Sequence, residues 1–228
     1  MLKFKYINKL NGGINLDWYE VYLEQIQKSG GNNAYMDFKI RHKKKLINII
    51  KKYSNNGKII EAGCGTGIIT SHLANIGFNA TGIDVNDNIL ELARNLEKNF
   101  YGDNKAKFIN KSIFELDYPK NSFDLCFSCG VLEHFEDDKI VLSINQQLNI
   151  ANTVIIVIPT KWFNDNEALH GDDRFLRLSY WRDLITKANG NILSEYSYPF
   201  KQNIKQKLLN LKKIFRPKAY RIFVISSK

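Results

Sequence analysis

The 228-residue chain has a formal net charge of +10 at pH 7, with 44% hydrophobic and 25% charged residues. It contains no 18-residue apolar stretch without charges, its start lacks an apolar core of secretory length, and its three cysteines form no disulfide framework, so we expect a cytoplasmic protein without a membrane span. The length favours one α/β domain, 1–228, with a modest cap.

The positive charge alone does not identify a partner. It would suit nucleic acid or an anionic membrane, but Lys, Asn and Ile are abundant along the whole chain, and this compositional bias accounts for the charge equally well. The basic residues concentrate near the two ends, over 39–52 and 201–221.

The region ahead of the glycine-rich stretch is expected to be helical. Residues 16–28 and 36–53 have the pattern of two helices, and we interpret 1–53 as an N-terminal helical cap. The lysines over 39–52 are best explained as the solvated face of the second helix.

The middle of the chain alternates between strand and helix patterns. A short apolar strand over 58–63 precedes a helix over 67–76, which Gly77 ends. Strands alternating with helices indicate βαβ units and hence a mostly parallel sheet. The further expected elements are a strand over 78–85, a helix capped by Asn86 or Asp87, strands over 105–110 and 122–128, a helix over 136–149 and a strand over 152–159.

The pattern changes after Pro159. Residues 160–178 are polar and aromatic without clear periodicity, and we interpret them as a substrate lid. A helix capped by Ser179 and stopped by Gly190 follows. Two late strands, over 191–200 and 219–227, complete the chain.

A basic segment over 200–218 joins the two late strands. Its apolar residues fall on one helical stripe and its lysines lie mainly off that stripe. Such a helix suits an anionic membrane surface or a lipid-linked substrate. A helix docked on its own domain explains the pattern more simply, so peripheral membrane contact is left open and is not favoured.

Three alternate glycines, Gly63, Gly65 and Gly67, follow the strand over 58–63. They let the backbone turn sharply and approach a flat ligand. A nicotinamide-binding loop reads G-x-G-x-x-G, and Ile68 occupies its last place here. Glu61 would repel a pyrophosphate about 4 Å away by roughly 4 kcal/mol, whereas it would attract a cation. The pattern therefore favours S-adenosylmethionine (SAM), which carries an ammonium and a sulfonium, over NAD.

Asp84 lies at the end of the next strand. In an open parallel sheet the ligand crevice lies outside the carboxyl ends of the strands. A carboxylate there can accept both ribose hydroxyls, each bond contributing about 1.5 to 3 kcal/mol. NAD and SAM both present a ribose, so Asp84 does not discriminate between them.

Three motifs together carry a family resemblance. IIEAGCGTG, GIDVND and NSFDLCFSCGVLEHFED, in this order and spacing over about residues 40–160, resemble the class I SAM-dependent methyltransferases. The resemblance implies SAM as cofactor and methyl transfer as activity. It also implies an α/β, Rossmann-like three-layer sandwich with a mostly parallel seven-stranded sheet, strand order 3-2-1-4-5-7-6, and an antiparallel last strand.

The resemblance assigns roles to individual residues. An acid such as Glu61 holds the amino group of SAM, an acid such as Asp84 binds the ribose, and the glycine loop backs the methionine. The implied cofactor-binding residues are Arg41, Glu61, Gly63, Cys64, Gly65, Gly67, Asp84, Val85, Ser112, Ile113, Ser128, Cys129 and Gly130.

One position departs from the family pattern. The family commonly places an Asp after the third strand to accept from the adenine amino group, whereas this chain has Ser112, a weaker acceptor. Ile113 would pack on the adenine, and Arg41 would reach the methionine carboxylate. Ser128 to His134 would face the reacting sulfonium.

Two histidines are candidate catalytic bases. A sulfonium is already activated, so alignment supplies most of the rate, and a base matters for a hydroxyl acceptor. His134, after the fourth strand, and His170, in the expected lid, are the candidates. A purely structural role in the turn or the lid explains each histidine at least as well.

Absent motifs narrow the substrate. No Asn-Pro-Pro-aromatic stretch follows the fourth strand and no Pro-Cys nucleophile is present, so nucleic acid is disfavoured as substrate. Cys126 and Cys129 form C-x-x-C, but residues three apart on a strand face opposite ways, so we expect no metal. Aromatic residues around the lid favour a small-molecule acceptor.

Two rival functions stay open. One is an NAD-dependent oxidoreductase, disfavoured by Ile68 and Glu61. The other is a noncatalytic protein with the SAM fold that docks RNA or an anionic membrane through its basic surface. The sequence leaves the acceptor, the choice between O- and N-methylation and the oligomeric state undecided.

Overall fold

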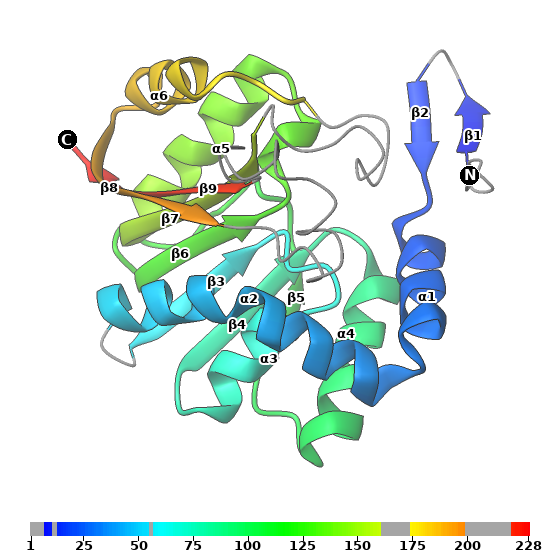
Figure 1. The fold of residues 1–228 in the computed structure, drawn as a ribbon. Helices are drawn as coiled ribbons and strands as arrows, with labels where there is room; N and C mark the ends of the chain where they lie inside the picture. The colour runs from blue at the N-terminus through cyan, green and yellow to red at the C-terminus, as the bar shows by residue number, and fades with distance from the viewer. Residues whose placement is uncertain (1–6, 11–12, 55–56, 161–173, 199–219) are drawn as a thin grey trace, which may run out of the picture.

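The computed structural model describes residues 7–10, 13–54, 57–160, 174–198 and 220–228. Seven strands form one sheet in the order β5-β4-β3-β6-β7-β9-β8 (Figure 1). This order confirms the arrangement implied by the family resemblance. The strands are β3 (Lys58–Ala62), β4 (Asn79–Asp84), β5 (Lys107–Asn110), β6 (Phe123–Cys129), β7 (Ala151–Pro159), β8 (Gly190–Tyr198) and β9 (Tyr220–Ser227).

Strands β5, β4, β3, β6 and β7 run parallel, and β9 is antiparallel to both β7 and β8. The interior strand β7 is an almost unbroken apolar run, as expected for a strand that is buried on both faces. The parallel strands bring their carboxyl ends to one edge of the sheet. Because β9 runs the other way, its first residue, Tyr220, pairs with Pro159 at this same edge.

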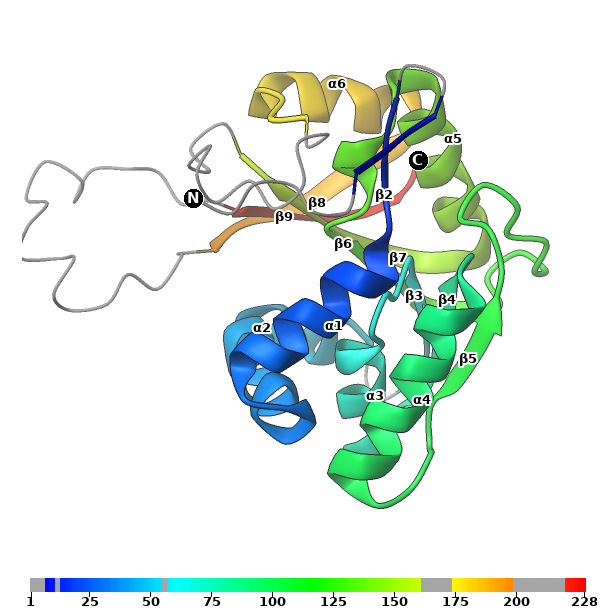
Figure 2. The ribbon, with the colours of Figure 1, turned by 90° about the vertical axis from the view of Figure 1, so that its right-hand side faces the viewer.

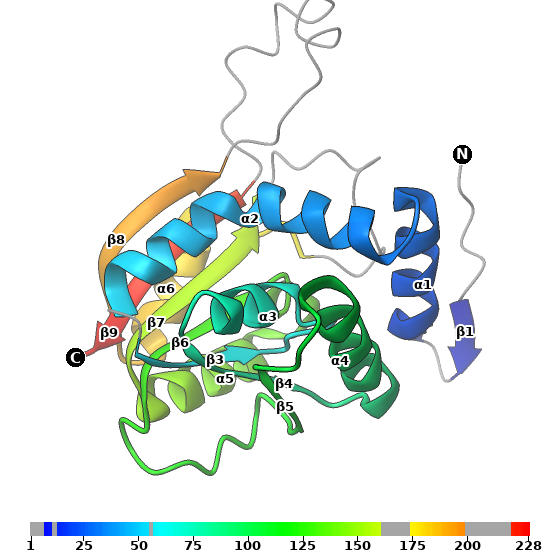
Figure 3. The ribbon, with the colours of Figure 1, turned by 90° about the horizontal axis from the view of Figure 1, so that it is seen from below.

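Helices cover both faces of the sheet (Figures 1 and 3). Helices α5 (Asp137–Ile150) and α6 (Leu178–Lys187) lie on one face, and α2 (Asn32–Ser54), α3 (Ile68–Asn75) and α4 (Asp87–Tyr101) lie on the other. Successive strand residues alternate between the two cores: Ile59 packs with α2 and α3, whereas Ile60 packs with α5 and α6. This confirms the three-layer sandwich.

Helix α1 (Trp18–Ser29) packs against α2 and α4 beside the sheet edge (Figure 2). Asp17 caps its start by accepting the Tyr19 N–H (3.1 Å), and Gly30, at φ +90°, ends it. The chain thereby reverses into α2, and the facing sides of the two helices bury Ile26 and Tyr35.

The expectation of a purely helical segment over 1–53 is wrong at its start. Strands β1 (Ile7–Leu10) and β2 (Gly13–Leu16) pair antiparallel ahead of α1. The sequence between them is Asn11-Gly12, a pair strongly favoured in two-residue hairpin turns. This pair is a sequence signal that favours antiparallel pairing of the strands on either side of it.

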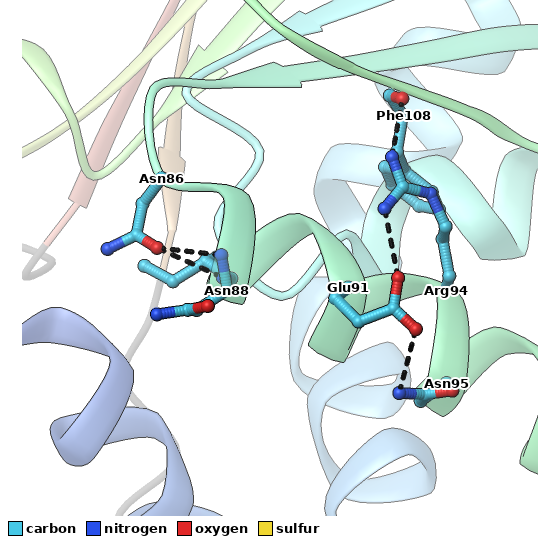
Figure 4. Close-up of polar contacts among 7 residues, drawn as sticks. Asn86, Asn88, Glu91, Arg94, Asn95 and Phe108 are labelled. Atoms are coloured by element: carbon cyan, nitrogen blue, oxygen red, sulfur yellow. Dashed lines mark hydrogen bonds and ion pairs between the residues drawn. The ribbon is translucent and has the colours of Figure 1, made fainter.

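Helix α4 is fixed by polar contacts along its length (Figure 4). The Asn86 side chain caps it by accepting the Asn88 N–H at 3.0 Å, which confirms one of the two predicted caps. Further along the helix, Arg94 donates to the Phe108 carbonyl (3.0 Å) and pairs with Glu91 (3.2 Å). The Arg94–Phe108 bond ties α4 to β5.

Helix α6 begins earlier than predicted. It starts at Leu178 after Arg177, without a side-chain cap, so the assignment of Ser179 as cap is wrong. Burial of Trp181 against the α5 side of the core sets the helix position instead of a capping bond. Most of the expected lid over 160–178, including His170, and the expected insertion over 200–218 lie outside the described residues. Within the described part of the chain, no helix has the length and apolar character to cross a membrane.

Candidate functional site

Two adjoining pockets open at the carboxyl edge of the sheet. The larger has a volume of about 690 Å³ and lies over the ends of β4 and β5. The smaller, of about 550 Å³, lies between the glycine loop, the end of β6 and helices α1 and α2. Both are lined by Trp18, Tyr22, Gly63, Gly130 and His134.

The glycine loop meets the pockets at Gly63, whereas Gly65 and Gly67 line neither pocket. Gly63, Gly65 and Gly67 all have left-handed backbones, at φ +73°, +52° and +64°. A Cβ on Gly65 would lie 2.5 Å from the Tyr22 hydroxyl, and one on Gly63 would lie 2.7 Å from Val131. The loop therefore requires glycine for its conformation and for its close contacts. Cys64 lies in this loop and lines the smaller pocket.

Asp84 joins the loop to the end of β4. Its carboxylate accepts the Gly65 N–H at 3.0 Å and the Asn86 N–H at 3.2 Å. Burial raises the pKa of Asp84, and these backbone bonds oppose the rise. The residue lines the larger pocket beside Val85, whose side chain is 65% exposed.

The far end of the larger pocket is formed after β5. Ser112 and Ile113 line it together with Ile89 and Phe114. The Ser112 hydroxyl oxygen accepts the Phe114 N–H at 3.1 Å, so its proton and one remaining lone pair are available to a ligand. The structure thus brings Asp84, Ser112 and Ile113 into one pocket.

Glu61 lies at the floor of the smaller pocket with only 4% of its surface exposed. Its Oε2 accepts the Thr70 N–H at 3.1 Å and also a bond from the Thr70 hydroxyl. Burial raises the pKa of Glu61 to about 8, although the Thr70 bonds and the charge of Lys43 oppose the rise. A cationic ligand group would favour the ionised carboxylate in this position.

The prediction that Arg41 reaches the site is wrong. Arg41 is 72% exposed at its side chain, pairs with Asp37 at 2.6 Å and lines neither pocket. The helical period places Lys39 and Lys43, four residues apart, on the pocket side of α2 instead. Arg41, two residues from each, points about 160° away from that side.

The end of β6 contributes two of its three predicted residues. Cys129 lines the smaller pocket, where its sulfur accepts from Lys43 Nζ at 3.1 Å, and Gly130, at φ +73°, lines both pockets. Ser128 is 2% exposed and lines neither, so its prediction is wrong. Strand alternation directs Ser128 to the opposite face, on the side of Cys126, which packs in the α5 core.

His134 lies in a short 3₁₀ turn, Leu132–His134, and lines both pockets. Its ring meets Trp18 edge-on, with centroids 5.3 Å apart. Arg174 fastens both neighbours of this histidine: its N–H donates to the Glu133 carbonyl (2.9 Å) and its guanidinium to the Phe135 carbonyl (2.5 Å). The position of His134 therefore depends on a residue near the end of the expected lid.

Sequence reasoning missed the contribution of α1. Trp18 and Tyr22, one helical turn apart, line both pockets. Burial, followed by the nearby Tyr35 and Asp84, raises the pKa of Tyr22 well above its usual range. The only signal in the sequence was the i, i+4 spacing of two aromatic residues, which is also typical of an ordinary helix core.

The central part of the chain matches a known protein-family model. The family model described as a methyltransferase domain matches residues 60–149. Curated relatives include a ubiquinone biosynthesis O-methyltransferase from Pelagibacter ubique, 26% identical over 55% of this chain and 48% of the relative. Another, from Rickettsia typhi, is 33% identical over 43% of this chain and 39% of the relative. The matches thus span less than half the length of these relatives.

Solved structures share the fold at low identity. Magnesium protoporphyrin IX methyltransferase from Synechocystis, solved with bound S-adenosylhomocysteine (SAH), has a TM-score of 0.68 at 13% identity and covers 92% of this chain and 96% of its own. A SAM-dependent methyltransferase from Clostridium acetobutylicum has a TM-score of 0.62 at 16% identity, covering 86% and 99%. The cyclase SpnF is also similar, with a TM-score of 0.60 at 14% identity, covering 80% of each chain.

Proposed function

We propose that this chain is a class I SAM-dependent methyltransferase, as the methyltransferase-domain match over residues 60–149 supports, and that it transfers a methyl group from SAM to an oxygen or nitrogen of a small-molecule acceptor. The observation that carries the proposal is the convergence of Glu61, Gly63 and Asp84 on two adjoining pockets. The matched relatives named as O-methyltransferases support the reaction class.

The residues of the site fit SAM. In the proposal Asp84 accepts from the ribose hydroxyls, Ile113 packs on the adenine and Ser112 binds its polar edge, all in the larger pocket. The glycine loop fits closely against its protein neighbours, because a Cβ on Gly63 would clash with Val131 and one on Gly65 with Tyr22. When bound, SAM supplies a methyl group on a sulfonium that is already activated for transfer.

The smaller pocket suits the methionine end. A carboxyl group whose pKa is raised to about 8 by burial gains most from an adjacent ammonium, because that charge stabilises the ionised form. A pyrophosphate would meet repulsion from the same group. This contrast disfavours a dinucleotide at the loop.

The protein residues act mainly by positioning. Trp18, Tyr22 and His134 line both pockets and so surround the place where an acceptor would approach the donor. Holding two reactants in line in a site of restricted water access supplies about 7 to 11 kcal/mol of barrier reduction. His134 is placed to take a proton from a hydroxyl acceptor, which would add about 10²- to 10⁴-fold to the rate.

Calorimetric titration with SAM and SAH tests the proposal. We expect saturable binding of both, and no binding of NAD to the same site in competition. A screen of phenolic, carboxylic and amine acceptors, with detection of released SAH, then identifies the acceptor class. Failure of SAM and SAH to bind at millimolar concentration would remove the proposed function.

A further inference from the structure

Lys39 occupies an unusual place in the wall of the smaller pocket. It is half-buried, and its Nζ donates to the Gln25 side-chain oxygen at 3.0 Å. The same Nζ lies 5.1 Å from the centroid of the Tyr35 ring. Both contacts hold the ammonium group toward the pocket that the two helices α1 and α2 enclose.

No carboxylate compensates this charge within the described residues. Lys28 on α1 and Arg41 on α2 form ion pairs, with Glu24 and Asp37, at 2.6 Å each, whereas Lys39 and Lys43 form none among the residues described. Burial, and then the charge of Lys43, lower the pKa of Lys39 to about 8. An anionic ligand group would offset both the desolvation cost of the buried Lys39 charge and the repulsion between the two lysines.

The two lysines face different parts of the pocket. Lys43 contacts Cys129 and lies near enough to Glu61 to oppose the rise in its pKa. The carboxylate of SAM is bonded to the same carbon as its amino group, so Lys43, on the Glu61 side, is the lysine suited to it. Lys39 lies one turn earlier, about 6 Å away along the helix axis.

The surroundings of Lys39 lead outward from the donor site. Next to it on α2, Phe38 also lines the smaller pocket and is 54% exposed, with its ring stacked on His42 at a centroid distance of 6.0 Å. An aromatic surface beside a cation fits a ligand that has an apolar body and an anionic group.

We propose that Lys39 forms the acceptor-specificity subsite and binds a carboxylate or phosphate group of an amphiphilic acceptor. The proposal rests on the proposed methyl-transfer function, because the bound molecule is a methyl acceptor only if that function holds. Anion binding at Lys39 itself is testable without turnover. Lys39 is a specificity residue in this account and takes no part in the transfer of the methyl group.

The test measures how fast trinitrobenzenesulfonate labels Lys39 in the whole chain saturated with SAH. Peptide mass spectrometry follows the extent of labelling at each lysine. Benzoate and phenyl phosphate are the anionic probes, and benzamide and phenol are their neutral counterparts, each at about 10 mM, which saturates a site of submillimolar affinity. Labelling of Lys44, which is exposed on the same helix and lines neither pocket, is the internal control.

We expect at least one aryl anion to slow Lys39 labelling about fivefold or more beyond SAH alone, at site occupancy above about 80%. Neutral probes should have no such effect, and Lys44 should be unaffected throughout. Which of the two anions protects identifies the group as carboxylate or phosphate. Full protection by SAH without a probe would assign Lys39 to the methionine carboxylate and overturn the proposal, as would protection by neither anion.

A variant pair gives the second readout. For an anionic acceptor found in the screen, K39Q should raise KM about 10- to 100-fold, the range that follows from losing one charged hydrogen bond, with kcat little changed. K44Q should leave both constants unchanged, and K39R should restore part of the loss. An acceptor whose KM is the same in K39Q overturns the proposal. Absence of SAH binding to the unmodified chain would instead defeat the proposed function, and probe protection measured without SAH would still decide the subsite.

Discussion

The two pockets of the site differ in what builds them. The larger pocket is built mainly at the ends of β4 and β5, where the sheet dictates position, and Trp18 and Tyr22 of α1 close one side of it. The smaller pocket takes one wall from the sheet edge and the other from α1 and α2. In the proposed function, this difference separates a nucleoside end at the sheet from a methionine and acceptor end whose outer wall depends on the helices that cover it. Substitutions at the two ends should therefore have separable effects.

Asp84→Ala should give the largest effect on donor binding. The change removes a carboxylate that we propose accepts two ribose hydroxyls and that also holds the Gly65 N–H. At about 1.5 to 3 kcal/mol for each charged bond, SAH affinity should fall about 100-fold or more, measured by calorimetry. Asp103→Ala, an exposed site between α4 and β5, is the matched control and should bind SAH normally. Retained affinity in Asp84→Ala would contradict the assignment of the nucleoside to the larger pocket.

Gly65→Ala should weaken donor binding about 10- to 100-fold. A left-handed backbone costs a non-glycine residue about 1 to 2 kcal/mol, and the new Cβ would lie 2.5 Å from the Tyr22 hydroxyl. Gly77→Ala is the control, because Gly77 also has positive φ but a Cβ added there would meet no atom within 4 Å. If both variants bind SAH alike, the close contact with α1 does not matter to the site.

Glu61 should couple donor binding to a proton. Since burial raises its pKa to about 8, the carboxyl is mostly protonated at pH 7, and an ammonium at this position should expel up to about one proton. Calorimetry in two buffers of different ionisation enthalpy at pH 6.5 to 7 measures this release, and affinity should rise with pH toward about 8. Glu61→Gln should abolish the release, whereas Glu91→Gln, on the exposed side of α4, should keep it.

The same shift affects stability in the opposite direction. The folded-state pKa of about 8 lies above the ordinary value of 4.5, so the protonated carboxyl contributes stability that is fully present below that ordinary value. This contribution is lost as pH rises through about 8. Between pH 4.5 and about 8, the free energy of unfolding of the ligand-free protein should therefore fall as pH rises. Glu61→Gln should reduce this fall, as measured by urea denaturation.

Arg174→Ala should have the smallest effect and should act on the acceptor end alone. Arg174 holds the carbonyls on both sides of His134 and pairs with Asp137 at 2.8 Å. Because this contact is partly exposed, we expect kcat to fall about tenfold while SAH affinity stays unchanged. Arg174→Lys should retain part of the rate, and Arg177→Ala, exposed nearby, should retain all of it. Weaker SAH binding in Arg174→Ala would indicate a general structural role instead.

Much of the donor end follows from the sequence because its signals are local. Alternate glycines after an apolar strand, and an acid at the end of the next strand, determine both the turn and its place at the sheet edge. The strand order came from the family resemblance, since periodicity does not give the order of strands. Ser128 shows the limit of a strand motif: a shift of one residue moves a side chain to the other face.

The acceptor end was harder to predict because helix phase is a tertiary property. Arg41, Lys39 and Lys43 are equivalent basic residues in the sequence, and packing of α2 on the sheet decides which of them face the pocket. Trp18 and Tyr22 come from a helix that reaches the site across the edge of the sheet, without any motif. The antiparallel pair β1 and β2 did have a local sequence signal, in Asn11-Gly12, which the helical interpretation overlooked.

A crystal structure of the chain soaked with SAH tests the central claim most directly. The account predicts one molecule spanning both pockets, with the ribose at Asp84, the adenine on Ile113 and the amino group at Glu61. SAH bound elsewhere, or the glycine loop occupied by the diphosphate of a dinucleotide, would contradict it.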